Sequence, residues 1–364
     1  MRVLAPAAAA LLVTASATGC IKFTGPASAL HPVRRDSTPT WRVCRVPDRC
    51  ASEVRFTYLG VGGFLIRAGS EAVLTAPSFT RPGWLSVVMP LWPIHSDSAV
   101  VDQELRRFLG SDLGALDGVH SILVGHAHYD HLLDVPLIAR RYAPRATIYG
   151  SLTTKRILMG DSALRARASR IDSLSPADSV IATPWRVGRW IYSPSRRMRF
   201  MAMQSSHAPN WWIITIAPCH TQHDRGSLPR TAWGWCRGEP VSYLIDLLDE
   251  NGRPALRIFY QDAAAQPMDV LLPPFTGTDQ KSVDVAIVCA GNFKKVADYP
   301  TLLVAALRPK YVILGHWEDF FHRQGDMPTP VRLTDTKELA RRLDLMGAGQ
   351  WITPVPGGQV AVEY

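Results

Sequence analysis

The chain has 364 residues, of which 47% are hydrophobic, and its mean hydropathy is close to zero. This composition excludes a disordered or fibrous chain and suits a globular protein with one large core. Its 40 Lys and Arg exceed its 31 Asp and Glu, which gives a formal net charge of +9. Because these basic residues are scattered, we interpret them as a solvated surface, although anionic lipid or an acidic substrate is an alternative partner.

The N-terminus predicts export. Arg2 is followed by an apolar stretch and then by small residues, a secretory pattern that is too short to span a membrane. Residues 17–20 resemble the bacterial lipobox, in which cleavage leaves an acylated cysteine as the first residue. We therefore expect residues 1–19 to be a signal peptide and Cys20 to be lipidated, so that a membrane-anchored lipoprotein results in the bacterial cell envelope. Plain secretion and an uncleaved anchor are the alternatives.

Residues 20–40 contain several prolines among Ser, Thr and Gly and show no apolar period, so they predict a tether. Residues 50–364 contain no long linker, so we predict a single domain over residues 41–364. Export also bears on the six cysteines, because disulfides form in oxidising compartments. We predict one disulfide between Cys44 and Cys50 and one between Cys219 and Cys236, and a free buried thiol at Cys289.

The first half of the domain predicts strands over 54–67, broken by glycines, and over 71–79. Residues 81–97, with three prolines, predict an irregular loop. Packing on the core, contact with substrate and contact with a membrane are the alternative roles of this loop. Further elements follow in chain order: a helix over 101–109, a strand over 121–124, a helix over 132–142, a strand over 146–149 and a helix over 151–159.

The second half alternates strands with helices. Its predicted elements are a strand over 199–203, a hairpin of 241–248 and 255–261, strands over 283–288, 310–314 and 360–362, and helices over 301–307 and 334–346. Hairpins that come first, followed by alternating strands and helices, suggest a two-sheet core with helices outside.

The strongest chemical signal directly follows the strand over 121–124. His126, His128, Asp130 and His131 place four potential metal ligands within six positions, at the edge of a buried strand. Imidazole and carboxylate together suit zinc, iron or manganese. Any one of these histidines could be structural, but the whole string predicts a metal site.

This H-x-H-x-D-H string resembles the signature of the metallo-β-lactamase superfamily, and the later order of residues is similar as well. His207, Asp262 and His316 each follow a predicted strand, as the family's third histidine, its bridging aspartate and its last histidine do. The resemblance covers residues 54–364. It implies an α/β fold of the αββα type, a four-layer sandwich with the metal site at one edge.

The resemblance also implies a division of the ligands between two divalent transition-metal ions, zinc first, with iron or manganese as alternatives. One ion would be held by His126, His128 and His207, the other by Asp130, His131 and His316, and Asp262 would bridge them. Such a pair can share a hydroxide that attacks an ester or phosphodiester. In this scheme Asp130 is also catalytic, because it orients the nucleophile.

Two departures and one distinction qualify the resemblance. Gln261 replaces the usual glycine before the bridging aspartate, and Ala76 replaces an aspartate before the proline of the third strand. The zinc β-lactamases that confer broad resistance carry cysteine where this chain has Asp262, so we do not expect β-lactamase activity. The string from Tyr129 to Leu132 and the late Gly315-His316 look like the ascorbate-phosphate lactonases and N-acyl phosphatidylethanolamine phospholipase D.

We expect a small-molecule or lipid substrate and no nucleic acid, since the chain is exported. The alternatives are a lactonase for a small polar substrate and a surface lipoprotein that binds metal without catalysis. An insertion after His207 contains Trp211, Trp212 and His223, which we predict to contact substrate; the equal alternative is a disulfide-stapled aromatic cap. Asp134 is interpreted as a helix cap, and residues 317–319 as support for the site or as a turn. The sequence makes no prediction of oligomeric state.

Overall fold

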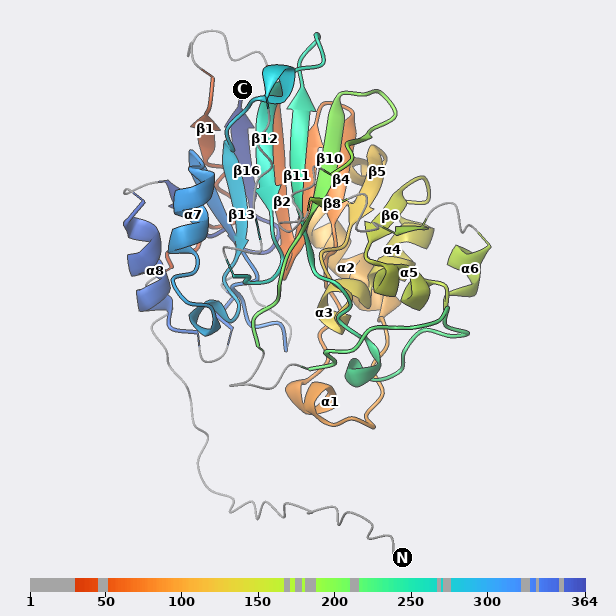
Figure 1. The fold of residues 1–364 in the computed structure, drawn as a ribbon. Coiled ribbons are helices and arrows are strands. Elements are labelled where there is room, and N and C mark those ends of the chain that lie inside the picture. The colour runs from red at the N-terminus through yellow and green to blue at the C-terminus, as the bar shows by residue number, and fades with distance from the viewer. Residues whose placement is uncertain are drawn as a thin grey trace, which may run out of the picture.

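Two eight-stranded mixed sheets form the centre of the fold. The structure is a computed structural model that describes residues 30–44, 52–166, 171–173, 179–180, 188–209, 216–266, 270, 276–321, 328–331, 334–346 and 350–364. Helices α7 and α8 lie on one side of the paired sheets, and α2, α4 and α5 lie on the other (Figure 1). The layers therefore follow the order helix, sheet, sheet, helix, as predicted for an αββα sandwich.

The first sheet combines an antiparallel meander with a parallel half. Its spatial order is β1 (Thr40–Arg42), β16 (Gln359–Glu363), β2 (Glu53–Gly60), β3 (Gly63–Ala68), β4 (Glu71–Thr75), β5 (Val119–Leu123), β6 (Thr147–Gly150) and β7 (Ile171–Ser173). Strands β2, β3 and β4 pair antiparallel across short turns, whereas β4, β5, β6 and β7 pair parallel. Parallel neighbours need crossover connections, and helices supply them here.

The second sheet has the same mixed character. Its spatial order is β15 (Trp351–Ile352), β14 (Tyr311–Gly315), β13 (Val285–Cys289), β12 (Pro254–Tyr260), β11 (Val241–Leu248), β10 (Met198–Gln204) and β8 (Ser179–Val180), and β9 (Ile191–Tyr192) pairs with β10. Strands β11 and β12 form the predicted hairpin, while β12, β13 and β14 run parallel.

Eight α-helices are found among the described residues. They are α1 (Trp84–Val88), α2 (Ser98–Leu109), α3 (Tyr129–Leu132), α4 (Val135–Arg141), α5 (Leu152–Leu158), α6 (Ser162–Arg165), α7 (Thr301–Leu307) and α8 (Thr336–Asp344), with short 3-10 helices at Gly114–Leu116, Ala232–Gly234, Gly277–Asp279 and Phe293–Lys295. In α2 the side chain of Asp97 accepts the first free amides, as an N-cap should. No helix of the described residues is long and apolar enough to cross a membrane.

Buried side chains gather into two hydrophobic clusters. The larger one lies between the sheets and continues beneath α7 and α8, and it includes Phe56, Met201 and Leu339. The other lies between the first sheet and the helices α2, α4 and α5, and it includes Leu105 and Ile138. The sheets are thus buried on both faces through most of their length, which explains the near-continuous apolar runs of β11 and β13.

Two sequence-based predictions need correction. Residues 81–97 contain the helix α1, because Pro82 and Pro90 flank these five residues and do not interrupt them. The predicted tether of residues 20–40 also extends too far. Leu30 is only 1% exposed, and the Val33 amide donates to the Thr353 carbonyl at 2.8 Å. The packed structure therefore includes Leu30, well before the predicted boundary at residue 41.

The cysteines behave as predicted where they are described. Cys219 and Cys236 form a disulfide, and Cys289 is a buried free thiol whose pKa is raised by burial. Cys44 is disulfide-bonded, while its predicted partner Cys50 lies outside the described residues. The lipidation site Cys20 lies outside them as well.

Candidate metal centre

Seven histidine and aspartate side chains converge at one end of the sandwich, where strands from both sheets finish. In the first sheet, β5 ends at Leu123; His126 and His128 follow in the turn before α3, and Asp130 and His131 lie within α3. In the second sheet, His207 follows β10, Asp262 follows β12 and His316 follows β14. Figure 1 shows α3 at the lower end of the ribbon, opposite the β11–β12 turn. The rigid strand ends therefore set the positions of these side chains.

The seven residues fall into three overlapping groups that could each hold a metal ion. Within each group the potential ligand atoms all lie within 4.8 Å of one another. The groups are His126, His128 and His207; Asp130, His131 and His316; and His126, His131 and Asp262. The first two are the two sets implied by the sequence resemblance, and the third joins them through the predicted bridging aspartate.

Two carboxylates lie among the imidazoles. Asp262 Oδ1 is 3.0 Å from His126 Nδ1, and Asp262 Oδ2 is 3.4 Å from His131 Nδ1. Asp130 Oδ2 is 3.4 Å from His316 Nε2 and 3.6 Å from His131 Nε2. Each carboxylate thus faces two imidazole rings across a space of a few ångströms.

Several polar atoms of this cluster are buried without a hydrogen-bond partner. They are His126 Nε2, His128 Nε2, His131 Nδ1, His316 Nδ1 and Asp262 Oδ2. Buried polar atoms are normally hydrogen-bonded, so several unsatisfied ones at a single place require an explanation. A nitrogen and oxygen donor set of this kind fits zinc, iron or manganese. The residues present therefore suit a metal centre.

The imidazoles are held in the form that binds metal. Burial lowers the pKa of His126, His128 and His207 well below the usual value, and it lowers the pKa of His131 to about 4. In each case the positive charge is disfavoured because the ring has lost contact with water. At neutral pH the rings are uncharged, which leaves a lone pair free for a cation.

The pKa values of the two aspartates are shifted in opposite directions. Burial favours the neutral form of both, and for Asp262 it prevails and raises the pKa. For Asp130 the attraction of His131 and His316, together with a hydrogen bond to His316, outweighs burial and lowers the pKa. Asp130 is therefore an anion at neutral pH, and a bound cation would favour the same state of Asp262.

Two glycines make room for these side chains. A Cβ atom at Gly125 would lie 2.3 Å from both carboxylate oxygens of Asp262, and one at Gly62 would lie 2.8 Å from His131 Nδ1. Both positions are therefore restricted to glycine by close approach. The Tyr260 hydroxyl donates to the Gly62 carbonyl at 2.6 Å, so the strand that leads to Asp262 also fixes this turn.

His207 is oriented by its own backbone neighbour. Its Nδ1 lies 2.5 Å from the Ala208 carbonyl oxygen, which can only accept a hydrogen bond, so Nδ1 must carry the proton. The other ring nitrogen, Nε2, is left with its lone pair. A hydrogen bond of this kind is how metal-binding histidines are usually oriented.

A buried glutamate supports the last histidine. Glu318 is fully buried; its Oε1 accepts from the Val61 amide at 2.7 Å, and its Oε2 accepts from the Tyr58 hydroxyl. The amide of His316 in turn contacts the Val61 carbonyl at 2.7 Å and the Tyr58 hydroxyl at 3.0 Å. Both His316 and Val61 have a φ of +53°, a strained region for side-chain-bearing residues. Glu318 thus holds the turns at Val61 and His316 together. Of the two interpretations of residues 317–319, support for the site and a turn, the contacts of Glu318 favour support.

Asp134 is not the helix cap predicted from the sequence, because its side chain makes no capping hydrogen bond. Its carboxylate accepts from the amides of Phe79 and Thr80 at 2.8 and 2.7 Å, and from the hydroxyls of Thr80 and Ser96. The aspartate that follows His131 by three residues therefore fixes the loop after β4. No local pattern identifies this role, since its partners lie 38 to 55 residues away along the chain.

The predicted substrate-binding residues and Gln261 lie outside the ligand groups of the described residues. His223 is exposed and belongs to none of the three ligand groups found among the described residues, so its contact with substrate stays a prediction. Trp211 and Trp212 lie outside the described residues. Gln261 is buried, and its side chain bonds to the hydroxyls of Ser205 and Tyr299.

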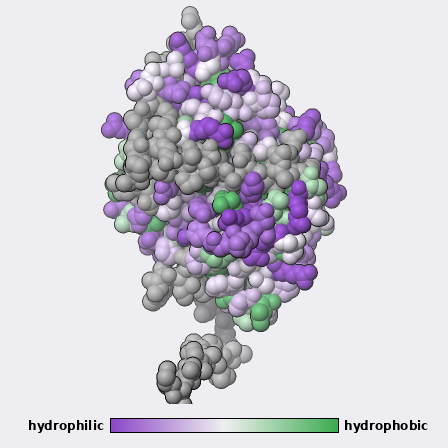
Figure 2. Space-filling view, turned by 45° about the vertical axis from the view of Figure 1, so that its right-hand side comes forward, coloured by the Kyte–Doolittle hydropathy of each residue, from purple (hydrophilic) through white to green (hydrophobic). Residues whose placement is uncertain are grey.

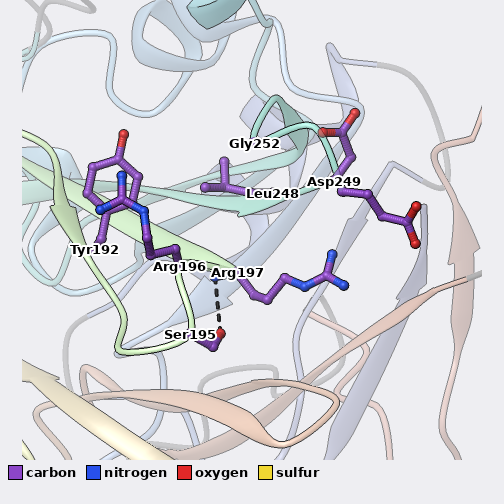
Figure 3. A pocket seen from close by; sticks show the side chains of 8 residues that line it. Tyr192, Ser195, Arg196, Arg197, Leu248, Asp249 and Gly252 are labelled. Atoms are coloured by element: carbon purple, nitrogen blue, oxygen red, sulfur yellow. Dashed lines mark hydrogen bonds between the residues drawn. The ribbon is translucent and has the colours of Figure 1, made fainter.

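A surface hollow of about 440 Å³ lies at the other end of the second sheet. It is lined by the turn before β10 and by the β11–β12 turn, and Figure 3 shows Arg196 and Arg197 on one side and Asp249 on the other. The seven residues of β10, at about 3.3 Å each, place it roughly 20 Å from the metal cluster. The residues that line this hollow belong to none of the three ligand groups, so we do not place the functional site there.

No family model and no curated protein sequence matches the chain. Among solved structures, the chain is similar to Igni18, a metallohydrolase from Ignicoccus hospitalis, with a TM-score of 0.45 and 15% identity over 86% of this chain and 99% of that one. It is similar to the diiron β-hydroxylase CmlA from Streptomyces venezuelae, with a TM-score of 0.45 and 11% identity over 86% of this chain and 54% of that one.

A third similar structure, from Thermotoga maritima, is described as a zinc-dependent hydrolase of the metallo-β-lactamase superfamily. Its TM-score is 0.33 and its identity 10%, over 85% of this chain and 100% of that one. Identities and TM-scores this low leave the function to be inferred from the side chains of the site.

Proposed function

We propose that the seven side chains hold two divalent transition-metal ions, zinc first, and that the protein is a metal-dependent hydrolase. The observation that carries this proposal is the set of three overlapping ligand groups, each with its potential ligand atoms within 4.8 Å. Five atoms of these groups are buried without a partner. One tetrahedral site needs only four ligands, so seven residues suit two ions.

We assign His126, His128 and His207 to one ion, and Asp130, His131 and His316 to the other. The position of Asp262 supports its role as the bridge. Its two oxygens reach toward one ligand of each set, Oδ1 toward His126 at 3.0 Å and Oδ2 toward His131 at 3.4 Å.

The reaction class follows from this donor set. Two ions held there would supply Lewis acidity, which polarises an ester or phosphodiester and acidifies water. Asp130 would orient the attacking water, because its side chain is anionic and 11% exposed, so it meets solvent at the edge of the cluster. The tryptophan-rich segments of the chain favour substrates with an apolar part. We do not propose β-lactams as substrates, because the chain has Asp262 where the zinc β-lactamases carry cysteine.

For the location, we propose export and a lipid anchor at Cys20, in the bacterial cell envelope. The secretory pattern of residues 1–20 supports this proposal. The disulfide between Cys219 and Cys236 supports it too, because structural disulfides persist in oxidising compartments.

Elemental analysis of the natively purified protein tests the metal centre, and we expect close to two equivalents per chain. A panel of bis-phosphodiesters, phospholipids, lactones, aryl esters and β-lactams then tests the reaction. Asp262→Ala should lose both metal and turnover, whereas Asp112→Ala, at an exposed position, should keep both.

Each outcome of these two experiments has a distinct meaning. Protein that contains no metal and takes up none on reconstitution would refute the metal centre. Turnover of small polar lactones alone would assign a lactonase in place of a lipid-directed enzyme. A metal-loaded protein that turns over nothing would identify a metal-binding surface protein without catalysis.

A further inference from the structure

Large apolar side chains are exposed together on the segment of residues 81–95, here called the α1 segment. The exposed fractions are 41% for Trp84, 46% for Leu85, 44% for Met89, 88% for Leu91 and 46% for Trp92. Five of the nine large hydrophobic side chains found exposed in the described part of the chain thus belong to this one segment. Figure 2 shows hydrophobic, green atoms at the lowest coloured tip of the molecule, which is where α1 lies in Figure 1. A contiguous patch of this kind marks an interaction surface.

The α1 segment is firmly attached to the protein beneath it. Val87 and Ile94 are buried, with 1% and 5% exposure. The Val88 carbonyl accepts from the Trp233 indole at 3.1 Å, and the Ile94 amide donates to the Arg230 carbonyl at 2.7 Å. The exposed side chains are therefore presented outward by an anchored helix and loop.

Basic residues prevail within the two segments that form this patch, and the exposed acidic residues Asp97 and Asp224 lie just beyond them. The α1 segment contains no acidic residue and begins with Arg81, and residues 225–237, which hold it in place, contain Arg225, Arg230 and Arg237 and no acidic residue. Arg230 is exposed. Exposed tryptophan and leucine with an exposed arginine, Arg230, in the adjoining segment are side chains that enter the headgroup region of an anionic bilayer.

The patch is also connected to the metal cluster. Arg81 lies 3.6 Å from Glu318, which holds the His316 turn, and the preceding Thr80 is bound by Asp134, three residues after His131. In Figure 1 both α1 and α3 lie at the lower end of the molecule. A surface that contacts the patch therefore also lies near the metal centre.

We propose that the α1 segment is a membrane-docking surface, which inserts its tryptophan and leucine side chains into the headgroup region of a bilayer that contains anionic phospholipid. The predicted anchor at Cys20 would assist docking, because it would keep Leu30 close to the membrane. The ten residues from Cys20 to Leu30 span at most about 35 Å. One consequence of docking rests on the proposed hydrolase. Its substrates would be lipids whose scissile ester or phosphodiester lies at headgroup depth.

Vesicle sedimentation tests docking with no acyl chain present. The protein used starts at residue 21, which removes Cys20 and keeps every described residue. We expect it to bind vesicles of phosphatidylglycerol and phosphatidylethanolamine, and to bind pure phosphatidylcholine at least tenfold more weakly. Leu91→Asp and Trp92→Asp should each lower binding to the anionic vesicles at least tenfold. Leu345→Asp is the matched control, because this leucine is 66% exposed outside the patch, and it should bind within twofold of the unmodified chain.

Other outcomes would overturn the proposal. Failure to bind either vesicle, or patch variants that bind as well as Leu345→Asp, would remove the membrane as the partner. Light scattering that finds a dimer in the unmodified chain and a monomer in Trp92→Asp would assign the patch to a second copy instead. Thermal unfolding of each variant shows that it is folded. Because vesicle binding requires no turnover, its failure is distinguishable from failure of the proposed hydrolase.

Discussion

Replacing Glu318 with alanine tests whether this buried carboxylate holds the metal centre in place. The substitution leaves the Val61 amide, 2.7 Å from Oε1, buried without an acceptor, and such a donor costs about 1–3 kcal/mol. It also removes the acceptor of the Tyr58 hydroxyl, which keeps a weaker contact with the Val61 carbonyl at 3.3 Å. Arg81, with its side chain only 10% exposed, lies 3.6 Å from Glu318 and also loses this carboxylate, which adds to the cost because its charge is largely buried. We therefore expect the free energy of unfolding to fall by about 2–4 kcal/mol.

The same substitution should weaken metal binding, because the freed turn no longer fixes His316. Supporting residues of this kind typically change metal affinity about 10–100-fold. Urea unfolding with chelator present measures the first effect, and equilibrium metal titration measures the second. Glu318→Gln, which keeps an acceptor, should recover most of both. Glu53→Ala, with its side chain 42% exposed, should change the free energy of unfolding by no more than about 0.5 kcal/mol. A loss below about 1 kcal/mol with unchanged metal affinity would refute the reasoning.

Three further predictions concern the same site and its surroundings. Gly125→Ala should abolish metal binding, because the new Cβ would lie 2.3 Å from the carboxylate oxygens of Asp262. Gly226→Ala, which has open space around it, is the control and should keep its metal. Equal metal content of the two variants by elemental analysis would contradict this prediction. His131 alone should cost the metal-free protein up to about 3 kcal/mol as the pH falls from 6.5 toward 4, because the folded ring, with a pKa of about 4, resists the proton that the unfolded chain accepts. The lowered pKa values of His126, His128 and His207 add to this loss. Denaturation at pH 7.5 and 5 measures the effect, and equal stability at both would argue against it. Replacing Cys219 and Cys236 with serine should cost about 3 kcal/mol with metal content unchanged, and an unaltered Tm would show that the disulfide contributes nothing.

The sequence predicted the parts of the fold and site that depend on local pattern. Four ligand types within residues 126–131 identify a metal-binding turn by themselves, and the apolar strands before His207, Asp262 and His316 indicate that each stands at a strand end. The continuous apolar run of β13 and the largely apolar run of β11 likewise predict buried strands.

The rest depended on contacts between distant segments. Glu318 meets Val61 and Tyr58 across more than 250 residues of chain, so no spacing rule reveals it. Asp134 precedes a helix as a cap would, yet its hydrogen bonds go to a loop of the first sheet. Helix α1 was missed because three prolines in 17 residues outweigh a short helical stretch in any local pattern.

The origin of the ligands in two different sheets links metal binding to the assembly of the whole fold. Four of the seven residues follow β5 of one sheet, and three follow β10, β12 and β14 of the other. Ions held between them would join the sheets much as a cross-link does, and only a chain whose sheets are already docked offers a complete set of ligands. By mass action, every tenfold increase of free metal above the dissociation constant would stabilise the docked state by about 1.4 kcal/mol for each bound ion. Metal supply in the compartment where this chain folds would then help to determine how much of it survives there.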